Sequence, residues 1–125
     1  MSEPVPPIDD SEWLLRWVGS DHIERSADGS PKVFSESFRH GSFSVDRESI
    51  RSRIEFRGLH AGKFTAHFPV LGCRTVGYSV VADPLPENQA HALVTSPLTG
   101  NALRRMAKEL RDRYVVLFEP SSLSV

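Results

Sequence analysis

Residues 76–94, VGYSVVADPLPENQAHALV, decide how the rest of the chain is interpreted. Two apolar runs, 76–82 and 90–94, flank a polar segment that contains Pro84 and Pro86. Because proline has a fixed φ and no N–H group, these two residues cannot lie inside a hydrogen-bonded ladder. The stretch therefore predicts two strands joined by a rigid polar connection.

Other strands are predicted from alternation and from turn signals. Residues 63–71 alternate apolar and polar side chains most cleanly, although Pro69 places the end of this strand at an edge or a bulge. Asp28-Gly29 indicates a hairpin turn between strands at 22–25 and 32–38. Residues 114–118 are β-branched and aromatic, which favours a buried strand.

Two helices are expected. The first, over 97–112, places a single apolar stripe on one face, formed by Leu103, Met106, Ala107 and Leu110. The second is expected over 47–56, where Asp46 would accept hydrogen bonds from the first-turn amides as the N-cap. Ile50 and Ile54 would then share a face, and Gly58 would end the helix.

The segment 12–18, EWLLRWV, fits either regular structure. As a helix it would group Trp13, Leu14, Trp17 and Val18, and as a strand it would place Trp13 and Trp17 together with Leu15. The short length and the two tryptophans favour the strand. In either case the tryptophans are expected to be sheet-packing residues, with a binding platform as the alternative.

These elements predict an α+β fold with a mainly antiparallel sheet of about five to six strands and two helices on one face. A chain of 125 residues suits one domain, which we place at 11–120. Residues 1–10, with three prolines and few apolar groups, are expected to be a disordered leader, and 121–125 a tail.

Composition excludes several classes of protein. The net charge of −1 argues against nucleic-acid binding through bulk charge. Binding of that kind is possible only through the basic face of the last helix, formed by Arg104, Arg105, Lys108 and Arg111, which otherwise is a solvated surface or meets a protein partner. No apolar run has membrane-spanning length, so we expect no membrane contact and a cytoplasmic location.

Cofactor and metal chemistry has no support in the sequence. The five histidines show no metal-ligand spacing, so no metal site is expected. There is no G-x-S-x-G, Walker A or G-x-G-x-x-G motif, so no nucleotide cofactor is expected. The single cysteine, Cys73, cannot form an internal disulfide and is expected to be a buried, inert thiol.

The densest polar cluster beside a predicted core element lies around His91. Histidine titrates near neutrality, and with Glu87 or Asp83 close by it can act as a general base. The alternative is that His91 anchors the proline-rich connection by a hydrogen bond.

Two resemblances accompany these patterns. S-x-x-F at 35–38, SVD at 44–46 and DPLPEN-x-AHA at 83–92 resemble a group of small uncharacterised bacterial proteins, which implies a bacterial origin. Arg16, Ser35-Glu36-Ser37 and Glu119 follow the order of an arginine, a Ser-x-Ser strand and a late glutamate that surround NAD in ADP-ribosyltransferase-like toxins. The second resemblance is much weaker.

We therefore expect a non-catalytic binding or adaptor protein that works through a protein partner. The first resemblance suggests a bacterial multi-component system of the defence or toxin–antitoxin type. The alternative is a small enzyme, either ADP-ribosyltransferase-like or a hydrolase with His91 as general base. The sequence leaves the oligomeric state open.

Overall fold

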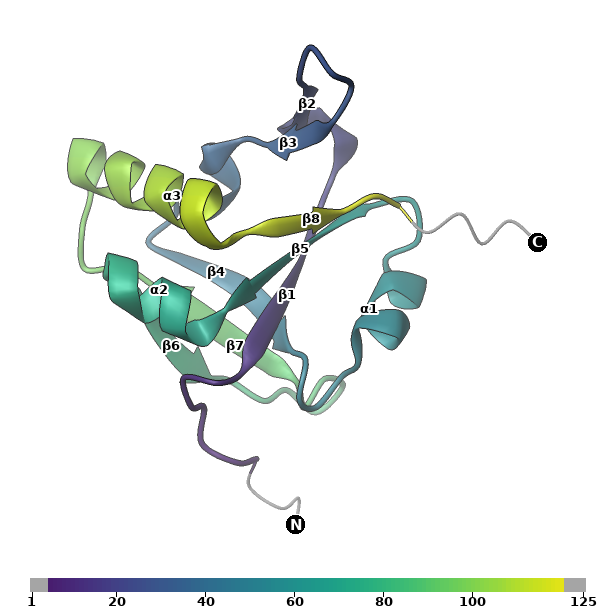
Figure 1. Ribbon diagram of the computed structural model, residues 1–125. Coiled ribbons are helices and arrows are strands. Elements are labelled where there is room, and N and C mark those ends of the chain that lie inside the picture. The colour runs from purple at the N-terminus through teal and green to yellow at the C-terminus, as the bar shows by residue number, and fades with distance from the viewer. Residues whose placement is uncertain (1–4, 121–125) are drawn as a thin grey trace.

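A six-stranded antiparallel sheet forms the centre of the computed structural model, which describes residues 5–120 (Figure 1). The strand order is β6-β7-β4-β1-β5-β8, and a two-stranded sheet, β2-β3, projects from one end. The strands are β1 (Trp13–Val18), β2 (Ile23–Arg25), β3 (Pro31–Val33), β4 (Ser42–Arg47), β5 (Phe64–Pro69), β6 (Ser79–Ala82), β7 (His91–Thr95) and β8 (Val116–Phe118). The helices are α1 (Arg53–Leu59), α2 (Val70–Val76) and α3 (Gly100–Tyr114), with 3₁₀ turns at Ser20–His22 and Ser35–Phe38. The predicted α+β fold is confirmed.

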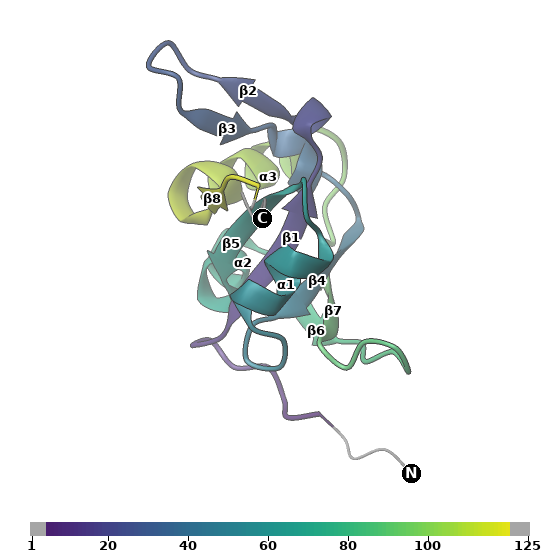
Figure 2. The same cartoon turned by 90° about the vertical axis from the view of Figure 1, so that its right-hand side faces the viewer.

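The two faces of the sheet are covered unequally. Helices α2 and α3 lie on one face, and α1 alone lies on the other (Figures 1 and 2). The covered face holds the main core, and all four residues of the predicted stripe on α3 are buried there. We call the opposite face, which carries α1, the open face.

The segment 12–18 is a strand, as its composition favours. Strand β1 pairs with β5 through six register positions but with β4 through only two, Leu14 with Arg47 and Leu15 with Asp46. Its side chains alternate as the strand interpretation requires: Leu14 joins the core under α2 and α3, whereas Trp13 and Trp17 lie on the open face. Beyond Leu15, β1 and β4 are not paired.

The helix expected at 47–56 begins later, so that prediction is wrong. Asp46 lies inside β4, and the N-cap of α1 is Ser52, whose Oγ accepts a hydrogen bond from the Glu55 amide. Ile54 is 85% exposed and does not share a buried face with Ile50. Gly58 lies within the helix, which ends at Leu59.

Other elements also differ from the sequence interpretation. Residues 70–76 form helix α2, which was not predicted because glycines at 72 and 77 are unfavourable in a helix. The strand expected over 76–82 begins only at Ser79. Strand β8 lies at the sheet edge, and Val116 is 49% exposed, so it is not the buried strand expected. The hairpin turn at Asp28-Gly29, strand β5 and strand β7 match their predictions. The second strand of the hairpin, expected over 32–38, is wrong in its length: β3 ends at Val33, and residues 35–38 form a 3₁₀ turn.

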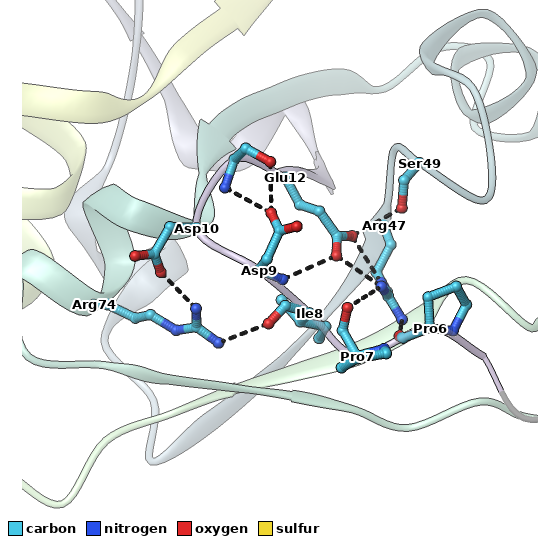
Figure 3. A network of polar contacts seen from close by, with 10 residues as sticks. Pro6, Pro7, Ile8, Asp9, Asp10, Glu12, Arg47, Ser49 and Arg74 are labelled. Carbon is cyan, nitrogen blue, oxygen red and sulfur yellow. Dashed lines mark hydrogen bonds and ion pairs between the residues drawn. The ribbon is translucent and has the colours of Figure 1, made fainter.

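The proline-rich segment 5–10 contacts the sheet through Arg47 (Figure 3). Arg47 is 1% exposed, and it donates to the carbonyls of Pro6 and Pro7 and to both carboxylate oxygens of Glu12. Ile8 packs against the core. These contacts involve part of the expected leader, whereas residues 1–4 and the expected tail at 121–125 lie outside the described residues.

Among residues 5–120, no helix is long and apolar enough to cross a membrane.

Candidate functional site

His91 and Asp46 lie opposite each other on neighbouring strands. The register of β4 and β7 pairs them, and their side chains therefore project from the open face of the sheet. His91 is half-buried and Asp46 is buried. The connection 83–90 reaches both residues, so the predicted cluster is formed at this point.

Asp83 holds His91 through two contacts to one ring nitrogen. Nδ1 of His91 lies 3.0 Å from the Asp83 carboxylate and 3.0 Å from the Asp83 carbonyl oxygen. A carbonyl oxygen only accepts, so Nδ1 carries the proton in this arrangement. In neutral His91, Nε2 is then the nitrogen with a free lone pair, as a general base requires.

Asp46 belongs to a closed polar network rather than to a helix cap. Its carboxylate accepts from Asn88 Nδ2 at 2.8 Å and pairs with Arg51 Nε at 3.3 Å. Arg51 in turn donates to Asn88 Oδ1 at 3.0 Å, and the Ala90 amide donates to the same oxygen. This network fixes the connection 83–90 against β4. It could not be predicted from the sequence, because Asn88 is far along the chain from Asp46 and Arg51.

A cleft of about 480 Å³ lies between α1 and this connection. Its walls include Glu87 and His91 on one side and Phe56 and His60 on the other. Burial lowers the pKa of His60, and Arg51 adds to this effect although Asp46 opposes it, so the pKa of His60 lies below the ordinary value of histidine. Of the predicted trio, His91 and Glu87 line the cleft, whereas Asp83 contacts the His91 ring without lining the cleft.

The two tryptophans lie on the open face beside this cleft. Trp13 stacks on His67 with ring centroids 4.5 Å apart, and Trp17 stacks on His60 at 6.0 Å. Trp13 is 38% exposed and Trp17 is 49% exposed. They pack along the sheet without being buried, which is compatible with a role as sheet-packing residues and with a role as a binding platform.

The predicted basic face of α3 lies on the other side of the molecule. Arg104, Arg105 and Lys108 are exposed, and Arg111 pairs with Asp112. Arg104 and Arg39 line a small hollow of about 290 Å³. Because α3 covers the opposite face of the sheet, these cations do not join the cleft at His91.

A larger cavity of about 660 Å³ lies where β1 and β4 separate. It is lined by Arg16, Ser37, His22 and His40, among others, and it shares Trp17 and Ser44 with the cleft. Arg16 and Ser37 of the transferase-like trio therefore meet, with Arg16 Nε donating to the Ser37 carbonyl. Glu119 does not line this cavity and instead pairs with Arg25.

Cys73 has no part in either cavity. It is fully buried as a free thiol, and burial raises its pKa to about 12. This agrees with an inert core thiol.

In the described part of the chain, no group of three or more histidine, cysteine or acidic side chains is arranged to hold a metal ion. Comparison with family models, with curated proteins and with solved structures gives no match. Both resemblances therefore stay predictions.

Proposed function

We propose that this protein binds a protein partner through the open face of its sheet, as a non-catalytic adaptor. The observation that supports this is the unequal covering of the sheet. Helices α2 and α3 bury one face, whereas the seven-residue α1 leaves apolar side chains exposed across the other. These side chains are Val81 on β6, Trp13 and Trp17 on β1, and Val116 on β8, each 38–51% exposed. Several large apolar side chains exposed on one face of a sheet are typical of interaction sites.

The cations beside the aromatic rings of this face favour an acidic partner. Arg53 lies over the Phe118 ring at 4.7 Å, Arg57 over the same ring at 5.5 Å, and Lys63 over Trp17 at 5.4 Å. Within residues 5–120 none of these three cations forms an ion pair, whereas the acids Asp46 and Glu48 are paired with Arg51 and His67. A partner segment that carries carboxylates among apolar side chains complements this surface. The partner is expected in the bacterial cytoplasm, within a multi-component system.

The test is affinity purification from the source organism, followed by titration of the purified partner. We expect Trp17→Ala to weaken binding by about thirtyfold, since a buried interface tryptophan contributes about 2 kcal/mol. The matched control is Leu71→Ala, which removes a side chain 52% exposed on α2, away from the open face. Lys63→Glu should weaken binding of an acidic partner and reduce the loss of affinity on adding salt, because it removes an attraction that salt screens.

Equal affinity for the wild type and Trp17→Ala, with thermal unfolding unchanged, would contradict the proposal. Recovery of single-stranded nucleic acid in place of a protein would contradict it as well, because aromatic rings beside cations also suit stacked bases.

The second candidate function is hydrolysis with His91 as the general base. It is favoured by the contact of His91 Nδ1 with Asp83, which leaves Nε2 for proton transfer at the cleft. A panel of activated ester and phosphodiester substrates tests it, comparing wild type with His91→Gln and Asp83→Asn. Turnover that His91→Gln abolishes without a change in melting temperature would establish the enzyme and rule out the non-catalytic adaptor.

A further inference from the structure

Arg16 lies where the sheet opens. Strands β1 and β4 are paired only as far as Leu15, and the Arg16 side chain bridges the gap that follows. Its Nη1 donates to the Ser44 carbonyl at 2.7 Å and its Nε donates to the Ser37 carbonyl at 3.2 Å. The guanidinium also lies over the Phe43 ring at 4.8 Å. These contacts hold the cation at the wall of the 660 Å³ cavity, here called the Arg16 cavity.

The charge of Arg16 has no anion to balance it within the described residues. Both of its hydrogen-bond acceptors are backbone carbonyls, and no carboxylate lies within ion-pair distance. The two acids next in sequence to lining residues, Asp21 and Glu36, are 82% and 61% exposed and approach His22 at 3.8 Å and Arg39 at 3.9 Å. Arg47 on the adjacent strand shows the contrast, because Glu12 neutralises it through two hydrogen bonds.

A partly desolvated cation without a counter-ion is costly for the folded protein. Burial lowers the pKa of Arg16, and no opposing effect of an acid is resolved. An anion bound in the cavity would offset this cost, so binding of an anion there is favoured.

We propose that the Arg16 cavity binds the phosphate group of a small phosphate monoester, with the Arg16 guanidinium as its charge partner. The other polar side chains around the cavity include donors suited to phosphate oxygens: the hydroxyls of Ser42 and Ser44, the imidazole of His40, and the pair of Ser37 and His22, whose Oγ and Nδ1 are hydrogen-bonded at 3.3 Å. The volume is that of a small-molecule site. Trp17 forms part of the wall and offers a ring against which an apolar or aromatic body of the ligand can stack. This proposal does not depend on the adaptor function.

The test uses inorganic phosphate, phenyl phosphate and benzoate, each titrated into the full chain by calorimetry at constant ionic strength. Phenyl phosphate should bind more tightly than inorganic phosphate because of Trp17, and more tightly than benzoate because of its second charge. Arg16→Gln should weaken phenyl phosphate binding at least about tenfold, the effect of losing one charge-assisted hydrogen bond.

Because Arg16→Gln also alters hydrogen bonds to two carbonyls, a second pair of variants separates binding from folding. Ser42 is exposed at the start of β4 and lines the cavity. Ser42→Asp would place a negative charge in the wall of the cavity and abolish phosphate binding, whereas Ser42→Asn, which has the same shape as the aspartate variant without its charge, would retain it. The absence of phosphate binding to the wild type would overturn the proposal, as would equal binding to Ser42→Asp and Ser42→Asn. Benzoate that binds more tightly than phenyl phosphate would overturn the assignment of the ligand class.

Discussion

Arg47 and Glu12 form an ion pair that is removed from solvent, and its integrity depends on both members. Their side chains are 1% and 10% exposed, with Arg47 Nη2 and Glu12 Oε2 at 2.7 Å (Figure 3). Glu12→Gln keeps the shape but leaves the buried guanidinium without its anion. We expect a loss of about 3 kcal/mol in the free energy of unfolding, measured by urea denaturation. Asp10→Asn, which removes the exposed pair with Arg74, should cost less than about 1 kcal/mol.

The same pair predicts a dependence of stability on pH. Burial raises the pKa of Glu12, but the hydrogen bonds from Arg47 and Ser49 outweigh it and lower the pKa below its ordinary value. A lowered pKa in the folded state adds stability above the unfolded-state pKa of about 4.3, and this stability is lost as pH falls through the folded-state pKa. Wild type should therefore lose more stability than Glu12→Gln on acidification below about pH 5. Parallel loss in the two proteins would contradict the role of this pair.

Asp46 shows why the site could be predicted only in part at the level of single residues. A sequence such as SVDRES satisfies the local requirements of a helix N-cap, and those requirements were all that the sequence offered. The structure instead satisfies Asp46 through Arg51 and Asn88. His91 and Asp83 were predictable because the short connection keeps both ends of the segment 83–91 close together. Arg16 could not be identified as an anion-binding residue from the sequence, because its lack of a counter-ion is a property of the folded molecule.

At the scale of elements, the contact of α2 with α3 depends on a glycine. A Cβ atom at Gly72 would lie 2.5 Å from Cγ and 3.0 Å from Cβ of Tyr114, at the C-terminal end of α3. Because these atoms are close to the backbone, the ring cannot simply rotate away. Gly72→Ala should destabilise the protein by about 1–3 kcal/mol, measured by thermal or chemical unfolding.

Gly58 provides the matched control for this substitution. It also lies inside a short helix, α1, but a Cβ atom there would meet nothing within 4 Å. Gly58→Ala should therefore stabilise the protein by about 0.5–1 kcal/mol, through the helix propensity of alanine alone. Destabilisation of similar size at both positions would show that the close approach of α2 and α3 is not the cause.

The helices also differ in how far their sequences define them. Helix α3 was predictable because it has 15 residues and because its buried stripe, from Leu103 to Leu110, follows the helical period. Helix α2 has seven residues, includes a glycine and follows Pro69, so its local sequence resembles a turn. Its buried residues, Val70, Gly72 and Cys73, indicate that packing rather than propensity stabilises it.

At the scale of the whole molecule, the order of strands should determine which parts open first. Strands β1 and β4 occupy the middle of the sheet, whereas β8 is an edge strand of three residues and β2-β3 is a separate hairpin. Opening an edge strand exposes little apolar surface, but opening the middle requires the whole sheet and its core to separate. We therefore expect amide hydrogen exchange to be slowest in β1 and in the strands paired with it. The free energy of opening measured for these amides should equal that of global unfolding.

The amides of β8 and of the β2-β3 hairpin should exchange earlier, through local opening. Glu12→Gln should accelerate exchange of the slowest amides by a factor that corresponds to its whole loss in the free energy of unfolding. In the variant, the exchange of β8 should change less, because the ion pair lies at the opposite side of β1 from β8 and is not broken when β8 opens. Mass spectrometry of peptides from timed exchange measures both effects. Uniform acceleration of every strand would mean that the domain opens as one cooperative unit, and it would contradict the graded stability inferred from the strand order.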